Sequence, residues 1–257
     1  MCLLVVAWKS HPRYRLVVAA NRDEFHERPA APLGWWNDDA RVLAGRDLQA
    51  GGAWLGVSRS GRFGAVTNFR ELERASAPDA PSRGRLVPDF LAADVPPEQF
   101  VAATAGAADR YAGFNLLLAS PDALLYFSNR AAEPARALAP GVYGLSNHWL
   151  DSPWPKLVRV RGKFAAVIGS GDAEAAPLFD LLADRDPAPG DAMPATGLPP
   201  DLEQALSSPF VMHEQYGTRC STVVLVGHDG RTTVAERRFD AAGSQTGATR
   251  LEFACAA

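Results

Sequence analysis

The sequence predicts an α+β fold made of two stacked antiparallel sheets covered by helices. Runs of apolar, β-branched and aromatic residues, typical of strands, occur towards both ends of the 257-residue chain. Segments with helix-like patterns lie between them. Four pairs of strand-like runs are joined by short connections, and such hairpins build antiparallel sheets. Because no internal repeat or domain-sized linker interrupts this order, we expect one domain, residues 1–257.

The first hairpin organises the rest of the chain. Residues 2–8 form an apolar run, residues 9–13 contain a turn with Pro12, and residues 14–20 have the composition of a second strand. A hairpin folds back on itself, so residues 21–24 at the end of the second strand should lie beside Cys2. We therefore expect a thiol, a guanidinium and two carboxylates at one end of a sheet.

The other elements follow from the same patterns. Further strands are expected at residues 41–44, 53–58, 63–68, 114–119, 123–128, 142–146, 221–227 and 232–239. Helices are expected at residues 86–93, 97–108, 154–168, 174–183 and 201–206. Gly51 and Gly52 permit a close approach of two backbones. Residues 70–85 and 184–200 contain the prolines and glycines of exposed loops.

Composition excludes several classes of function. A net charge of −3 gives no electrostatic reason to expect binding to nucleic acid or to an anionic membrane. No apolar stretch approaches the roughly 20 residues of a membrane-spanning helix. Three cysteines without paired or metal-like spacing argue against a disulfide framework and a metal site. A cytoplasmic protein is therefore expected, and the sequence does not predict its oligomeric state.

Cys2 has the position of an N-terminal nucleophile. A small residue at position two permits removal of the initiator methionine, which would give Cys2 a free α-amine. That amine has a reference pKa of about 7.7–8.0 and could act as a general base beside its own thiol. A neighbouring arginine would lower the pKa of the thiol, and an aspartate could hold the amine.

A purely structural interpretation is also open at these positions. Most free cysteines are small buried hydrophobic residues, and Cys2 could be one of them. Arg22 and Asp23 could form a structural ion pair that closes the end of the sheet. Glu24 is expected to support the turn or to pair with a basic residue. We favour functional roles for Cys2, Arg22 and Asp23 because the three occur together.

Several motifs, in order along nearly the whole chain, resemble the NRDE family, which includes the transport and Golgi organisation proteins. Cys2 and Asn21-Arg22-Asp23-Glu24 carry this resemblance at the N-terminus. The further matching segments are GGAWLG at 51–56, AVTNFR at 65–70, LSN at 145–147, DSPWPK at 151–156 and YGTR at 216–219.

The resemblance implies a fold and a set of site residues. The N-terminal half is similar to N-terminal-nucleophile hydrolases of the cholylglycine and penicillin-V acylase type, which implies a four-layer αββα sandwich. The implied catalytic residues are Cys2, Arg22, Asp23, Asn68 and Asn147. The implied substrate-binding residues are Asn21, Glu24, Trp54, Lys156 and Arg219.

Some of these roles stay open at the level of sequence. Asn68 and Asn147 each follow a predicted strand and could donate to an oxyanion, although asparagines in such positions also cap strand ends. Either Lys156 or Arg219 could supply a distal cation, and their spacing does not choose between them.

Two functions from different classes follow from the resemblance. The first is an amidohydrolase that cleaves a small non-peptide amide through a thiol acyl-enzyme and needs neither metal nor cofactor. The second is a non-catalytic haem-binding or trafficking protein, since family members are linked to haem handling and secretory organisation. Haem would then be the ligand, and its iron could be bound by Cys2, His26, His148 or His213. A structural role in binding a partner protein would be a third possibility, for which the sequence holds no signal.

Overall fold

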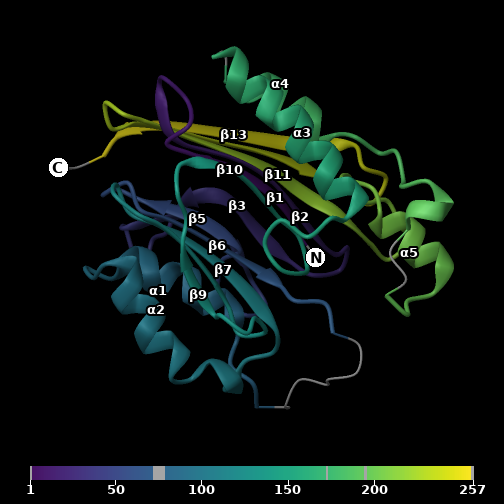
Figure 1. Cartoon of the computed structure of the whole chain (residues 1–257), viewed down its shortest axis with the longest axis horizontal. Coiled ribbons are helices and arrows are strands. Elements are labelled where there is room, and N and C mark those ends of the chain that lie inside the picture. Colours follow the sequence, from purple (N-terminus) through teal and green to yellow (C-terminus); the bar gives the residue numbers. More distant parts are fainter. Residues whose placement is uncertain (1, 72–78, 172, 194–195, 256–257) are drawn as a thin grey trace. The chain divides into compact units, whose positions relative to one another are not determined.

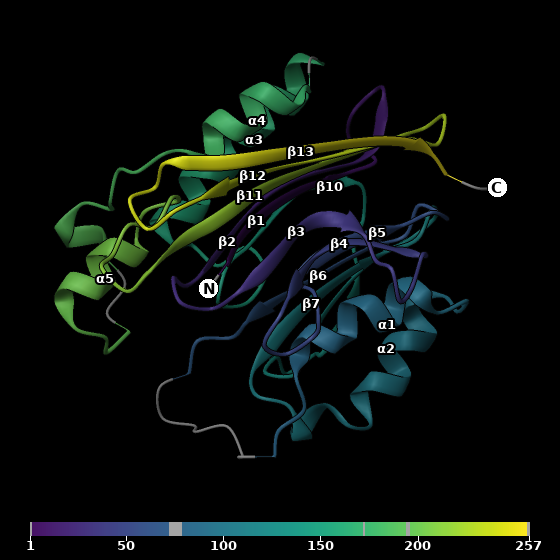
Figure 2. The same cartoon turned by 180° about the vertical axis from the view of Figure 1, so that it is seen from behind.

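The computed structural model describes residues 2–71, 79–171, 173–193 and 196–255. These residues form two compact units. The first unit comprises residues 1–27, 140–146 and 150–252, and the second comprises residues 28–139, 147–149 and 253–257. Each unit contains one antiparallel sheet and the helices that pack on it (Figures 1 and 2). The expectation that residues 1–257 form a single domain stays a prediction.

The first unit is built on a six-stranded sheet with the strand order β10-β1-β2-β11-β12-β13. Its strands are β1 (Cys2–Trp8), β2 (Tyr14–Phe25), β10 (Gly141–Leu145), β11 (Tyr216–Gly227), β12 (Arg231–Phe239) and β13 (Gln245–Ala254). The predicted first hairpin is present as β1 and β2, and β11 pairs with the free side of β2. Strand β2 is thus an inner strand with partners on both sides.

Helices α3 (Pro155–Ser170) and α4 (Ala175–Leu182) cover one face of this sheet. Alternate residues of the inner strands, such as Leu3 and Val5 in β1, point to that face and pack against α3 residues such as Phe164. A shorter helix, α5 (Pro200–Leu206), precedes β11 and contributes to a smaller apolar cluster with Val211 and Tyr216. The face covered by α3 and α4 is called the helix face below.

The second unit is built on a seven-stranded sheet with the strand order β3-β4-β5-β6-β7-β8-β9. Its strands are β3 (Ala30–Trp35), β4 (Val42–Asp47), β5 (Leu55–Ser58), β6 (Phe63–Asn68), β7 (Phe114–Ala119), β8 (Leu124–Ser128) and β9 (Ala135–Ala137). Helices α1 (Leu86–Ala92) and α2 (Pro97–Ala105) pack on it, and Phe90 of α1 is fully buried. Three short 3₁₀ helices span Arg83–Arg85, Ala108–Arg110 and Gly190–Ala192.

The predicted class, α+β with two antiparallel sheets and helices, is confirmed, but several strand boundaries were wrong. Strand β2 continues to Phe25, so residues 21–24 lie within the strand and not after it. Strand β11 begins at Tyr216 and not at residue 221. Strands β3, β9 and β13 were not predicted. Residues 72–78 of the predicted loop 70–85, and residues 194–195 of the loop 184–200, lie outside the described residues.

The predicted close backbone approach at the glycine pair is present. Gly51 has φ +73°, a conformation that L side chains rarely adopt. A Cβ on Gly52 would lie 2.4 Å from the carbonyl carbon of Gly84, where the backbone N–H of Ala53 donates to the carbonyl of Gly84 at 2.9 Å. Within the part of the chain that the structure describes, no helix is long and apolar enough to cross a membrane.

Candidate active site

Cys2 and Arg22 lie opposite each other on neighbouring strands. The register of β1 and β2 pairs Cys2 with Arg22 and Leu3 with Asn21. On the other side of β2, the register of β11 pairs Cys220 with Arg22. Side chains that are directly paired in antiparallel strands point to the same face of the sheet. Cys2, Arg22 and Cys220 therefore form one row across three strands, with Arg22 in the middle.

The residues Asn21 to Glu24 alternate between the two faces of the sheet because they belong to one extended strand. Asn21 is paired with Leu3, which packs in the core under α3 and α4, so Asn21 and Asp23 point to the helix face. Arg22 and Glu24 point to the opposite face, together with Cys2. The predicted cluster therefore lies near the start of β1, with side chains on both faces of the sheet.

Asp23 is almost completely buried, with 1 % of its surface exposed. Its Oδ1 accepts a hydrogen bond from the hydroxyl of Thr218 at 2.7 Å, and its backbone carbonyl accepts one from the hydroxyl of Tyr216 at 2.6 Å. Burial raises the pKa of the Asp23 carboxyl, and the positive charge of Lys156 and the Thr218 hydrogen bond oppose this rise. Lys156 and Thr218 thus favour a negative charge on Asp23 in a site that is shielded from water.

Asn21 uses its whole amide group within the protein. Its Nδ2 donates to the carbonyl of Leu182 and to the carbonyl of Pro209, both at 2.9 Å, and its Oδ1 accepts from the hydroxyl of Ser221 at 2.6 Å. These bonds tie β2 to the end of α4 and to the segment before β11. Asn21 was predicted to bind substrate, and its contacts in the structure are with the protein interior.

Glu24 pairs with a basic residue, which was one of the two roles expected for it. The Nη2 of Arg22 lies 3.7 Å from Oε2 of Glu24, and Oε1 of Glu24 accepts from the backbone N–H of Phe25 at 3.0 Å. Arg22 itself is buried. Arg22 and Asp23 point to opposite faces of the sheet. The ion pair at this end of β2, on the thiol side, is therefore Arg22 with Glu24 and not Arg22 with Asp23.

The thiol of Cys2 is less acidic than the sequence suggested. Cys2 is partly exposed as a residue, yet enough protein surrounds the sulfur that burial raises the pKa of the thiol. The charges of Asp23 and Glu24 raise this pKa further, whereas Arg22 lowers it. The expected effect of Arg22 is therefore present, but burial outweighs it. The thiol is protonated at neutral pH and needs a base before it can attack.

Lys156 and Arg219, the two candidates for a distal cation, have different environments. Lys156 is the second residue of α3, is 2 % exposed, and its charge acts on Asp23. Arg219 occupies a bulge of β11 between the Thr218 and Cys220 pairings, and its Nη1 donates to Nδ1 of His26 at 3.1 Å. Of the two, Lys156 is the cation whose charge acts on the predicted catalytic residues of the first unit.

Asn68 and Asn147 both belong to the second unit and contact each other. The side chain of Asn147 is fully buried, and its Nδ2 donates to the backbone carbonyl of Asn68 at 3.0 Å. The side chain of Asn68, the last residue of β6, is exposed. Trp54 packs over the backbone of Gly45, because a Cβ on Gly45 would lie 2.4 Å from the indole ring. Whether Asn68, Asn147 and Trp54 act on a substrate stays a prediction.

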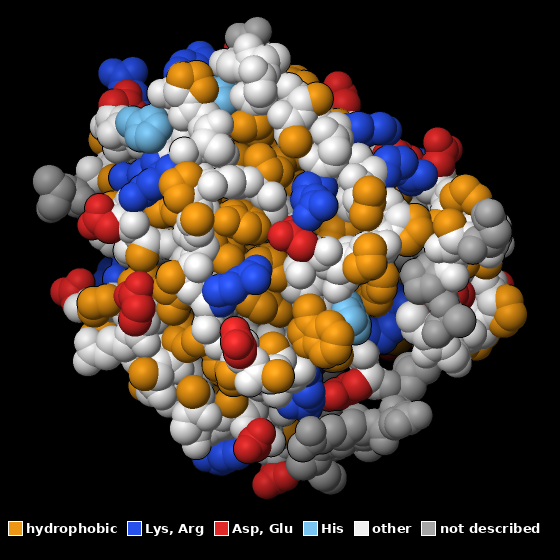
Figure 3. Space-filling view, viewed as in Figure 1, with side chains coloured by type: hydrophobic (Ala, Val, Ile, Leu, Met, Phe, Trp, Pro, Cys, Tyr) orange, Lys and Arg blue, Asp and Glu red, His pale blue; other side chains and the backbone are white. Residues whose placement is uncertain are grey.

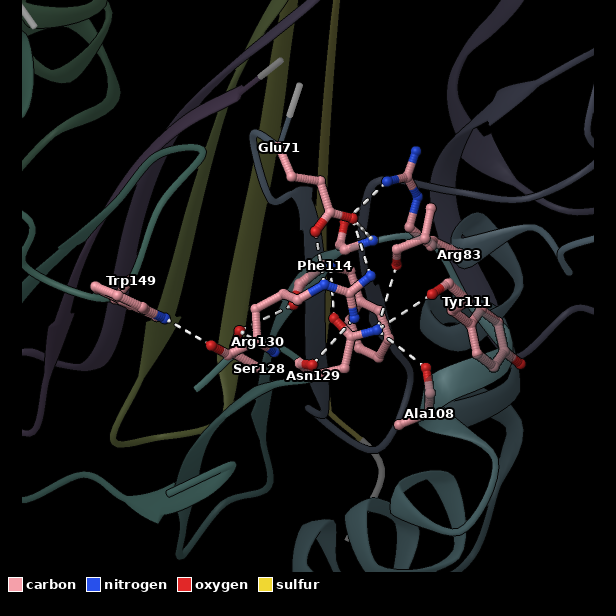
Figure 4. A network of polar contacts seen from close by, with 11 residues as sticks. Glu71, Arg83, Ala108, Tyr111, Phe114, Ser128, Asn129, Arg130 and Trp149 are labelled. Carbon is pink, nitrogen blue, oxygen red and sulfur yellow. Dashed lines mark hydrogen bonds and ion pairs between the residues drawn. The ribbon is translucent and has the colours of Figure 1, made fainter. Parts of the chain in front are cut away.

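A polar network centred on Glu71, Asn129 and Arg130 also includes Trp149, two residues after Asn147 (Figure 4). Arg130 donates to both carboxylate oxygens of Glu71, at 2.7 and 2.9 Å, and Glu71 also accepts from the backbone N–H of Gly113 at 3.0 Å. The indole N–H of Trp149 donates to the carbonyl of Arg130 at 3.1 Å. These bonds connect the end of β8 to the segment before β7 and to the Asn147–Trp149 segment.

The described residues contain no group of three or more His, Cys, Asp or Glu side chains that could hold a metal ion. Cys2, Cys220 and Cys255 are not joined in disulfides. On the face drawn in Figure 3, basic and acidic side chains are interspersed over the surface. The chemistry that the first unit offers is therefore that of a thiol, a guanidinium and a buried carboxylate.

Four polar contributors to this site were not predicted from the sequence. Thr218 and Tyr216 hold Asp23, Cys220 extends the Cys2–Arg22 row, and the Ser146 hydroxyl donates to the carbonyl of Cys2 at 3.1 Å. Two of these residues, Tyr216 and Thr218, are in the YGTR segment that matched the family, so that motif was the available signal. Ser146 follows β10, and only the pairing of β10 with β1 brings it to Cys2.

Comparison with known proteins identifies relatives that match most of the chain. A family model described as Transport and Golgi organisation 2 matches residues 1–241. The Bos taurus protein named Transport and Golgi organization protein 2 homolog is 36 % identical over 258 residues, which cover 92 % of each chain. The Drosophila melanogaster protein named Transport and Golgi organization protein 2 is 28 % identical over 265 residues, covering 90 % of this chain and 89 % of its own.

Among solved structures, the fold is similar to that of the mutant C2A of conjugated bile acid hydrolase from Clostridium perfringens. The match has a TM-score of 0.54 and covers 98 % of this chain and 92 % of the hydrolase. The two sequences are 9 % identical, so this likeness concerns the fold. It agrees with the N-terminal-nucleophile-hydrolase-like fold expected from the sequence.

Proposed function

Because the chain belongs to the Transport and Golgi organisation 2 family and has a fold similar to that of a hydrolase, we propose that it is an N-terminal-cysteine amidohydrolase. Its substrate would be a small non-peptide amide. The observation that carries the proposal is the pairing of Cys2 with Arg22 beside the buried carboxylate of Asp23. The similar hydrolase was solved as its C2A mutant, so that protein also has a cysteine at position two.

The protonated state of the Cys2 thiol decides which mechanism is feasible. Burial raises the pKa of this thiol, so little thiolate is present at neutral pH and a base must remove the proton during attack. An α-amine on Cys2 itself would be such a base, because its reference pKa is about 7.7–8.0. Met1 lies outside the described residues, and its removal is part of the proposal.

The proposed reaction has two stages. In the first, Sγ of Cys2 attacks the amide carbonyl carbon, and the α-amine takes the thiol proton and passes it to the departing nitrogen as the C–N bond breaks. In the second, water attacks the thioester, the acid is released, and the proton returns to sulfur. Asp23 would hold the α-amine, and Arg22 would offset negative charge near the sulfur.

The proposal is tested by trapping the acyl-enzyme. Purified protein is incubated with a library of small amides, and intact-mass spectrometry records both the state of Met1 and any acyl adduct. We expect an adduct on protein that lacks Met1, with turnover that Cys2→Ala abolishes. Cys255→Ala is the matched control, because Cys255 is also a partly exposed cysteine outside any disulfide but lies beyond the end of β13.

Two outcomes would contradict the amidohydrolase. Turnover that persists in Cys2→Ala would place the chemistry elsewhere. Turnover by protein that quantitatively retains Met1 would exclude the mechanism, because the nitrogen of Cys2 would then be an amide without basic character.

Haem binding is the alternative function, and one observation favours a site for it in the second unit. His148 stacks on Phe69 with ring centroids 5.1 Å apart and contacts Trp149 at 4.3 Å. Burial, aided by the charge of Arg70, lowers the pKa of His148, and a neutral imidazole is the form that binds a metal. Another candidate, His26, has protein contacts at both ring nitrogens: Nδ1 lies 3.1 Å from Nη1 of Arg219, and Nε2 lies 3.0 Å from the carbonyl oxygen of His213.

A titration with haemin separates the two functions. A stoichiometric Soret shift that His148→Ala removes, in protein without amide turnover, would support the haem alternative. Turnover that depends on Cys2 would support the hydrolase. For either function we propose a cytoplasmic location, where the thiols of Cys2 and Cys255 would stay reduced.

A further inference from the structure

Lys156 lies at a buried helix N-terminus, a position where lysine is unfavourable. It is the second residue of α3, where the positive end of the helix dipole disfavours a cation, and the first turn of this helix contains no acidic residue. Its side chain is 2 % exposed, although lysines are almost never fully buried unless they are paired. A buried lysine at this place therefore needs an anion close by.

A neighbouring strand of the sheet supplies that anion. Leu157 and Val160 of α3 belong to the same core cluster as Leu3 and Val5, and α3 packs against β10 and β1, the strand that adjoins β2. Asp23 points to this same face, because it follows Asn21 by two residues in β2. Lys156, from the helix, and Asp23, from the strand, thus lie on the same side of the sheet, and the positive charge of Lys156 acts on the Asp23 carboxyl.

The electrostatic interaction between them is strong in comparison with the other side-chain influences on Asp23. Burial is the largest influence and raises the pKa of the Asp23 carboxyl, and among the side chains that lower it Lys156 contributes more than Thr218 or Arg22. The other ionisable groups around Asp23 on the elements packed against it are Cys2, Arg22, Glu24 and Tyr216.

We propose that Lys156 is a positioning residue that keeps Asp23 ionised, so that the carboxylate can hold the α-amine of Cys2. This inference rests on the proposed amidohydrolase function for its catalytic consequence. Lys156 then acts through Asp23 from the helix face, where it does not touch the substrate. Its role differs from that of the distal substrate-binding cation suggested by the sequence.

The direct test measures protonation and does not need turnover. Protein labelled with ¹³C at aspartate carboxyl carbons is titrated by NMR as wild type, Lys156→Met and Asp23→Asn, and the last variant assigns the Asp23 signal. We expect the titration of Asp23 to move to higher pH in Lys156→Met. Reciprocally, the ¹⁵Nζ signal of Lys156 should titrate at lower pH in Asp23→Asn, because a buried ammonium loses its counter-charge. The chain has three lysines, Lys9, Lys156 and Lys163, so this signal is readily assigned.

Lys163→Met is the matched control on the same helix. Lys163 is half-exposed and its Nζ pairs with Asp184 at 3.1 Å. This variant should leave the Asp23 titration unchanged. If Lys156→Met does not fold, Lys156→Arg keeps the charge and decides the question. If Lys156→Arg folds and its Asp23 titrates as in wild type, the proposal is supported. If Lys156→Arg also fails to fold, the shape of lysine matters more than its charge, and the proposal is overturned.

Activity is a second and separate readout. If the protein turns over an amide, the acidic limb of the pH–rate profile should move to higher pH in Lys156→Met and stay in place in Lys163→Met. An Asp23 titration that is the same in wild type and Lys156→Met would overturn the inference, with or without turnover. A shifted titration in a protein without turnover would leave the Lys156–Asp23 interaction intact and contradict only the amidohydrolase.

Discussion

Replacing Asn21 with leucine should destabilise the first unit strongly without changing the reactivity of Cys2. Leucine has a similar size to asparagine but removes the two bonds donated to the Leu182 and Pro209 carbonyls and the one accepted from Ser221. Each hydrogen bond contributes a net ~1 kcal/mol, and carbonyls left unsatisfied in the interior add a further penalty. The expected loss in the free energy of unfolding is therefore roughly 3–5 kcal/mol, a large part of a typical total of about 5–15 kcal/mol.

Urea unfolding followed by circular dichroism measures this loss, and Ser221→Ala is the matched control. That control removes one of the three bonds and should cost about 1 kcal/mol. In the same preparations, the rate of iodoacetamide labelling at Cys2 should be unchanged in native buffer, because Asn21 points to the helix face and Cys2 to the other. A loss below about 1 kcal/mol, together with slower labelling of Cys2, would refute this reasoning and restore the substrate-binding role predicted for Asn21.

Three further predictions concern ionisable groups. Because burial raises the pKa of the Cys2 thiol, iodoacetamide labelling should reach half its maximal rate above the free-cysteine value of about 8.5, and a midpoint below this value would contradict the assignment. The folded-state pKa of Asp23 is also raised, so the stability that Asp23 contributes is complete below about pH 3.9 and is lost as the pH rises through the folded pKa. Asparagine does not ionise, so the free energy of unfolding of Asp23→Asn, measured by urea unfolding, should increase relative to that of wild type as the pH rises. A difference between the two proteins that does not change with pH would contradict this prediction. Glu71→Gln should lower stability by about 1–3 kcal/mol, because it weakens the two-bond pair with the largely buried Arg130. Asp39→Asn, whose partner Arg41 is exposed, should cost less than about 1 kcal/mol in the same thermal melts, and equal losses would contradict the argument.

The first hairpin shows what the sequence can predict and where it stops. The apolar runs of β1 and of the first half of β2 are strong strand signals, and their pairing followed from the short connection. The second half of β2 was missed because Asn, Asp and Glu are depleted in strands. Asn21 and Asp23 are nevertheless buried, and their partners Leu182, Thr218 and Lys156 come from more than 130 positions away. No local pattern contains that information.

The other differences also depend on contacts between distant segments. The sequence identified Lys156 and Arg219 as candidate cations but did not choose between them, since the choice depends on how α3 packs on the sheet. Strand β13 was missed because its residues alternate between exposed and half-buried and include polar and charged side chains at the edge of the sheet. By contrast, Cys2, Arg22 and Asp23 could be chosen as candidates from the sequence alone, because their positions along the chain carry the signal directly.

The alternation of Asn21 to Glu24 across the sheet restricts how this segment can change in length. A single residue inserted or deleted in β2 ahead of the motif would exchange the faces to which the motif residues point. Arg22 would then point into the apolar core under α3, and Asp23 would lie on the thiol side without Thr218. A two-residue change would preserve the faces and only move the motif along the strand. Homologous chains should therefore tolerate two-residue insertions or deletions in this hairpin far better than one-residue ones, whatever reaction the thiol performs.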